Sequence, residues 1–109
     1  MDLIDPELTL SQFEALPASV VAPLCEATET DLRERGLRML EAVTAGDAEG
    51  VRRARHSLKG LCGNFGATAI MLRADGDLAD AKAQRDFRAC IEATIAAVQA
   101  IAAPLIPPQ

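Results

Sequence analysis

Apolar residues recur at steps of three and four positions through most of the chain, which is the period of an amphipathic α-helix. No segment alternates apolar and polar residues between turn signals, as a half-buried strand would. The sequence therefore predicts an all-α protein. The longest stripe lies between residues 19 and 45 and consists of Val21, Leu24, Thr28, Leu32, Arg35, Met39 and Val43.

The chain has 109 residues, which is enough for one hydrophobic core but not for two. Trp and Tyr are absent and Phe occurs three times, so we expect an aliphatic core. A single domain over residues 1–109 is predicted. Its last residues, 104–109, form a proline-rich tail that cannot continue a helix.

Breakers and caps divide the chain into helices. A short first helix is expected to begin at Asp5-Pro6 and to end at Pro17. Gly46 then ends the long second helix, and Asp47 caps the third. Four sizeable helices with short loops, plus the short extra N-terminal helix, predict an antiparallel four-helix bundle. The four are expected over residues 19–45, 48–65, 68–83 and 86–103.

The helix predicted over 48–65 has an apolar face and an opposite polar face. At about 100° per residue, its apolar side chains fall within an arc roughly 100° wide, and His56 falls nearly opposite. His56 is the only histidine of the chain, and burial does not explain it. Its neighbours on the outer face are Arg52, Lys59, Gly60 and Gly63.

Gly60 and Gly63 each cost about 1 kcal/mol relative to Ala in a helix interior. We interpret them as an adaptation for access, because an imidazole without neighbouring side chains lets another protein's backbone come close. The alternative is close packing of a second helix against these small residues. Their position opposite the apolar stripe weakens that alternative.

Cations lie one helical turn to either side of His56, namely Arg52 and Lys59, and Arg55 flanks it less directly; we interpret Arg53 as an ordinary solvated charge. Neutral imidazole is a nucleophile near pH 7. A phosphoryl group on a ring nitrogen would carry two negative charges, which nearby cations would stabilise. The same cations would attract an acidic partner. The net charge of −5 excludes the protein from the usual class of nucleic-acid binders.

The stretch ARHSLKGLCGNFGA, residues 54–67, resembles the signature of histidine-containing phosphotransfer (HPt) domains, which has an H-x-x-K-G core followed by small residues. The expected order of a short helix and then a bundle is similar too. The resemblance implies that His56 is the phosphoacceptor and that Lys59 stabilises the phosphoryl group. It also implies that Gly60 leaves room around the imidazole and that Gly63 lets the partner approach.

The function implied by the resemblance is that of a phosphorelay intermediate in two-component signalling. His56 would accept a phosphoryl group from the aspartate of a response-regulator receiver domain and donate it to another, and a hybrid histidine kinase is a further expected partner. Mg²⁺ would belong to the receiver, with no cofactor in this chain. The chain lacks a Gly-rich nucleotide loop, so no autokinase activity is expected. We expect a monomeric, cytoplasmic phosphoprotein.

The resemblance has one departure, because many members carry Gln or Glu about twenty-two positions after the histidine, where this chain has Leu78. Either the register slips near Gly76 or the helper hydrogen bond is absent. A helical adaptor or inhibitor that binds a receiver or kinase without phosphotransfer remains an alternative. The phosphoacceptor half of a histidine kinase is disfavoured, since Ser57 rather than an acidic residue follows the histidine.

Cys25, Cys62 and Cys90 are too far apart for a zinc motif, so we expect buried free thiols in a reducing cytosol. The acidic N-terminus is unlike a signal peptide. No apolar run of about 18–20 residues lacks a charge or a helix breaker, so no membrane span is expected. The Met1 start and the proline-rich end favour a free-standing protein.

Overall fold

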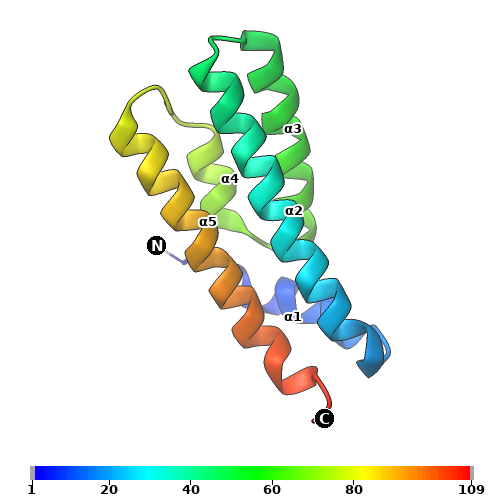
Figure 1. Cartoon of the computed structure of the whole chain (residues 1–109). Helices are drawn as coiled ribbons and strands as arrows, with labels where there is room; N and C mark the ends of the chain where they lie inside the picture. Colours follow the sequence, from blue (N-terminus) through cyan, green and yellow to red (C-terminus); the bar gives the residue numbers. More distant parts are fainter. Residues whose placement is uncertain (1, 109) are drawn as a thin grey trace.

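The computed structural model describes residues 2–108, and these form helices without any strand. In Figure 1, α2, α3 and α5 run side by side along the molecule, while the shorter α4 lies between α3 and α5. α1 packs against α3 and α5 at one end. The predicted all-α bundle is therefore confirmed. The elements are α1 (Pro6–Glu14), α2 (Ala18–Thr44), α3 (Ala48–Phe65), α4 (Thr68–Ala74), α5 (Ala81–Ala102) and a 3₁₀ turn (Ala103–Leu105).

The boundaries of α3 follow from its caps. The Asp47 carboxylate accepts a hydrogen bond of 2.9 Å from the backbone N–H of Gly50, which satisfies one free donor of the first turn. At the other end, Gly66 adopts a left-handed backbone with φ of 72°, a conformation that side chains disfavour. The predicted range of 48–65 is confirmed, and α2 begins and ends within one residue of its prediction.

The prediction of a fourth helix over 68–83 is wrong. α4 ends at Ala74, and α5 begins at Ala81, five residues before its predicted start at 86. The cause is local, since aspartate carboxylates take up backbone N–H groups that a continuing helix would need. Asp77 accepts a hydrogen bond of 2.9 Å from Ala79, and Asp80 caps α5 with a bond of 2.7 Å from Ala83.

The N-terminal segment is tied to the end of the third helix. The backbone N–H of Asp5 donates to the carbonyl of Gly66 at 2.8 Å, and the Thr9 hydroxyl donates to the carbonyl of Phe65. The rings of Phe13 and Phe65 meet beneath these bonds, with centroids 5.9 Å apart. α1 therefore closes the end of the bundle at which α3 terminates.

The apolar character of α5 comes from its place in the core. The segment Ala81–Leu105 is long and apolar enough to cross a membrane by length and composition alone. Its apolar stripe is nevertheless buried inside the bundle, because Phe87, Ile91, Ile95 and Val98 all pack in the core. Core packing accounts for the large apolar side chains of this stripe.

All three cysteines are buried free thiols, as predicted. Burial raises the pKa of the Cys62 thiol to about 12, and the nearby Cys90 adds to the shift while Arg35 opposes it. Burial also raises the pKa of Cys25, with further contributions from Glu29 and Glu26. The folded state therefore holds the thiol proton more tightly than the unfolded state does. The free energy of unfolding falls as the pH rises above the unfolded thiol pKa of about 8.5, because the unfolded state then loses its proton first.

Alkylation should therefore distinguish the folded thiols from the unfolded ones. At pH 8, iodoacetamide should modify Cys62 in the native protein at least about a thousandfold more slowly than in the protein unfolded in urea, since the thiolate is the reacting form. Mass spectrometry of tryptic peptides would measure the two rates. Equal rates would contradict the burial of Cys62.

Candidate functional site

His56 lies on the outer face of α3, exposed to solvent. On the opposite face of the same helix, Leu58 and Cys62 are completely buried. The phase predicted from the spacing of the apolar residues is therefore confirmed. Among residues 2–108, no hydrogen bond or ion pair engages the imidazole.

On one side of His56, α3 is held to the end of α4. The guanidinium Nε of Arg55 donates to the carbonyl of Ala74 at 2.8 Å, which satisfies an acceptor left free at the C-terminus of α4. The Lys59 ammonium lies 3.1 and 3.0 Å from the two carboxylate oxygens of Asp75. The lysine expected to stabilise a phosphoryl group thus already has an anionic partner.

On the other side, α3 is held to α2. The Arg35 guanidinium donates to the carbonyl of Ser57 at 3.0 Å, and the arginine is half-buried. α3 is therefore joined to its neighbours on both sides of His56, through the side chain of Arg55 and through the backbone carbonyl of Ser57. These contacts hold the part of α3 that carries His56, although none of the hydrogen bonds or ion pairs among residues 2–108 involves the imidazole itself.

Gly60 and Gly63 face open space. A Cβ atom added at either position would meet no atom within 4 Å, so neither glycine lies at a close contact with another helix. Gly36 on α2 is the contrast, because a Cβ there would lie 2.3 Å from Cδ1 of Ile91. The alternative of helix packing at Gly60 and Gly63 is therefore wrong for this chain. The two glycines and His56 form a continuous stretch of uncovered helix, which we call the open strip.

Arg52 lies at the N-terminal end of the open strip and is engaged by a neighbour. Its guanidinium forms an ion pair with the carboxylate of Glu49, one turn earlier on α3. Both partners are exposed, so the pair is weak and readily exchanged. The positive charge of Arg52 is therefore balanced by a neighbouring carboxylate. The prediction from helical spacing did not include this ion pair.

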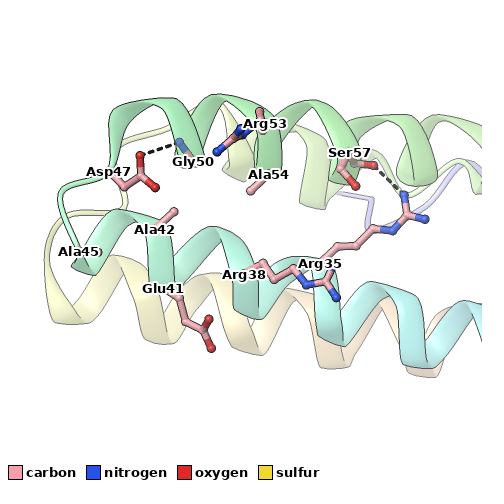
Figure 2. Close-up of a pocket in the computed structure, with 10 residues that line it drawn as sticks. All are labelled: Arg35, Arg38, Glu41, Ala42, Ala45, Asp47, Gly50, Arg53, Ala54 and Ser57. Atoms are coloured by element: carbon pink, nitrogen blue, oxygen red, sulfur yellow. Dashed lines mark hydrogen bonds between the residues drawn. The ribbon is translucent and has the colours of Figure 1, made fainter.

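A groove between α2 and α3 borders the strip on the α2 side (Figure 2). The short side chains of Ala42 and Ala54 point into the space between the helices and leave a volume of about 480 Å³. Three arginines line it, with Arg35 and Arg38 from α2 and Arg53 from α3, and two acidic residues, Glu41 and Asp47, line it as well. Arg53 is exposed, which agrees with its interpretation as a solvated charge, and its position beside arginines of α2 is a feature that spacing along one helix does not reveal.

Leu78 does not assist the histidine. It lies in the loop between α4 and α5, where its side chain is buried and its carbonyl accepts a hydrogen bond of 3.1 Å from Gln84. The expected polar helper would require α4 to continue past Ala74, and the helix has ended there. The group that α4 does bring to this part of α3 is the Asp75 carboxylate.

The site offers a nucleophile, a cation and open access. Among residues 2–108, no group of three or more His, Cys, Asp and Glu side chains is arranged to hold a metal ion. The ring nitrogens of His56 are free to attack an electrophile, and Lys59 follows one turn later on the helix. The site is thus an exposed reactive group on a rigid helix, without an enclosing pocket.

Fold and site together define a small helical bundle with a single exposed histidine on the outer face of one helix. A family model, the Hpt domain, matches residues 23–103, which include all but the first residues of α2 and continue through α5. The chain belongs to the Hpt domain family. Comparisons with curated proteins and with solved structures found no match.

Membership of this family gives the general function. Hpt domains take part in phosphotransfer within two-component signalling, and they interact with receiver domains and kinases. Such domains are typically soluble and cytoplasmic. The match shows membership of the family and assigns no role to any single residue.

Proposed function

We propose that this chain is a phosphorelay intermediate in which His56 accepts a phosphoryl group from the aspartyl phosphate of a receiver domain and donates it to the aspartate of another. The observation that carries the proposal is the exposed imidazole on the open strip of α3, which has no hydrogen-bond or ion-pair partner among residues 2–108. Lys59 would stabilise the phosphoryl group, while Gly60 and Gly63 would admit the partner's backbone.

The transfer is a balanced displacement at phosphorus. The lone pair of one ring nitrogen of His56 attacks phosphorus, the P–O bond to the aspartyl carboxylate breaks, and the carboxylate leaves with the bonding pair. The other ring nitrogen keeps its proton, so no base on this chain is needed. Because such transfers depend mainly on positioning and charge stabilisation, a domain that supplies a fixed nucleophile suffices. The Mg²⁺ ion would belong to the receiver, and this chain would need no cofactor of its own.

The charges around the strip suit an acidic partner. The net charge of the chain is −5, yet three arginines, Arg35, Arg38 and Arg53, line the groove beside His56 together with two acidic residues, Glu41 and Asp47. A local excess of positive charge on an acidic protein helps to orient an acidic partner during encounter. We expect a monomeric cytoplasmic phosphoprotein that meets a receiver, or a hybrid histidine kinase carrying one, through this surface.

One observation supports the alternative of an adaptor that binds without carrying phosphate. The two cations that lie one helical turn to either side of His56 already have carboxylate partners, Glu49 for Arg52 and Asp75 for Lys59. An adaptor would need the open strip for docking but would not need a free cation. Transfer of the phosphoryl group decides between the two functions.

The test is a transfer experiment with purified proteins. A receiver domain carrying a radiolabelled phosphoryl group should lose label to this chain, and the acquired phosphate should be labile in acid and stable in base, as expected for a phosphoramidate. ATP alone should leave the chain unlabelled. If the receivers that bind the chain retain their label, the relay function is wrong and the adaptor is favoured.

A further inference from the structure

The ion pair between Lys59 and Asp75 gives the site a second state. We propose that Asp75 is a positioning residue that competes with the phosphoryl group for Lys59, so that phosphorylation of His56 moves the ammonium from the carboxylate to the phosphoryl oxygens. The consequence is a more weakly held phosphoryl group that is passed on more readily. This inference rests on the proposed function of His56.

The geometry makes Asp75 a fixed competitor. Both of its carboxylate oxygens lie within hydrogen-bond distance of Lys59 Nζ, at 3.1 and 3.0 Å. Its backbone N–H donates to the carbonyl of Leu72 at 3.3 Å, so the residue closes the last turn of α4. The carboxylate is therefore held opposite α3 by the end of a helix.

The exchange requires only the lysine side chain to move. Lys59 follows His56 by three positions on α3, so their side chains are neighbours on the helix surface. The lysine carries one charge on a flexible four-carbon stem, and its side chain is 37% exposed. A phosphoryl dianion attracts the ammonium more strongly than a single carboxylate at the same distance.

Asp75 would not be left without a cation after the exchange. The Arg55 Nε atom lies 4.0 Å from a carboxylate oxygen of Asp75 while it donates to the carbonyl of Ala74. Arg55 therefore stays in place and compensates the carboxylate in both states. This second cation lowers the cost of releasing Lys59, as an exchange between two states requires.

The test compares Asp75→Asn with Asp77→Asn. The second variant removes the same charge from the same loop, and the new amide oxygen can still accept the hydrogen bond from Ala79. For Asp75→Asn, the equilibrium between phosphorylated receiver and phosphorylated His56 should shift toward His56 by about two- to fivefold, as expected for an exposed ion pair. Asp77→Asn should shift it by less than twofold.

A second measurement needs no receiver. Phosphoramidate donates a phosphoryl group to imidazole, its P–N bond breaking as ammonia leaves with the bonding pair. The second acid dissociation constant of the phosphoryl group on His56, followed by ³¹P NMR, should rise about two- to fivefold in Asp75→Asn, because a freed Lys59 favours the dianion.

Both effects must depend on Lys59. In a Lys59→Ala background, replacing Asp75 should change neither quantity more than replacing Asp77 does, which a purely structural role of Asp75 would not produce. An Asp75 effect equal to that of Asp77, an effect that persists without Lys59, or a shift toward the receiver would each overturn the inference. Failure of the relay itself would look different. A receiver would then not label the wild type, while the change in the acid dissociation constant of Asp75→Asn, measured by ³¹P NMR after labelling with phosphoramidate, would still appear.

Discussion

Replacing His56 with glutamine should abolish phosphoryl transfer to this chain and leave its fold unchanged. The glutamine amide lacks a nucleophilic ring nitrogen, so the N–P bond cannot form. His56 is exposed and has no intramolecular partner among the described residues, so the free energy of unfolding should change by no more than about 0.5 kcal/mol. Radiolabel transfer and urea unfolding measure the two quantities. Labelling of the variant at the wild-type rate would rule out His56 as the acceptor.

The same variant separates the two candidate functions when binding is measured as well. A relay intermediate should still bind its receiver after the substitution, with an affinity within a few-fold of the wild type, because the glycines and arginines of the surface are unchanged. Transfer should then be lost while the complex persists. An adaptor would also bind, but neither the wild type nor the glutamine variant would acquire label from the receiver.

Replacing Gly63 with leucine should slow transfer about ten- to a hundredfold while stabilising the protein. The added side chain would stand in open space on the strip and hold the partner away from His56, and a displacement of about 1 Å in a reacting group costs up to a hundredfold in rate. The helix would gain about 0.5–1 kcal/mol, since glycine is unfavourable in a helix interior. Transfer kinetics and urea unfolding should therefore change in opposite senses.

Two control variants show whether the added bulk on the open strip causes the slower transfer. Gly63→Ala should stabilise the helix by a similar amount with a smaller loss of rate, because a methyl group projects less. Ala96→Leu adds a comparable side chain at an exposed position of α5, a helix that lies across the bundle from α3, and should leave transfer unchanged. Wild-type transfer by Gly63→Leu would show that the partner does not approach over the strip.

The helix that carries the site could be predicted almost completely, whereas the end of α4 could not. In α3 the apolar period, the Asp47 cap and the terminal Gly66 all indicate the same boundaries, and the structure follows them. After Ala74 the apolar spacing continues to Leu78, which is buried whether the chain is helical or not. Periodicity therefore could not separate a continuing helix from a loop that packs one leucine into the core.

The hydrogen-bond and ion-pair partners of the charged residues could not be predicted from the sequence, for a related reason. The outward phase of His56 follows from spacing within one helix, and so does the position of Lys59. The pairing of Lys59 with Asp75 joins residues sixteen positions apart, and the contact of Arg35 with Ser57 joins two helices. Such contacts depend on where α4 ends and on how α2 packs, neither of which a single-helix pattern contains.

The anchoring of α3 has a consequence for the binding of its partners. The helix is capped by Asp47 at its start, joined to the N-terminal segment through Gly66 at its end, and tied to its neighbours beside His56. A face that is already ordered loses little conformational entropy when a partner docks. The open strip is thus preorganised, and a modest contact area can give sufficient affinity. In the proposed relay, donor and acceptor would then dock in turn on one unchanging surface.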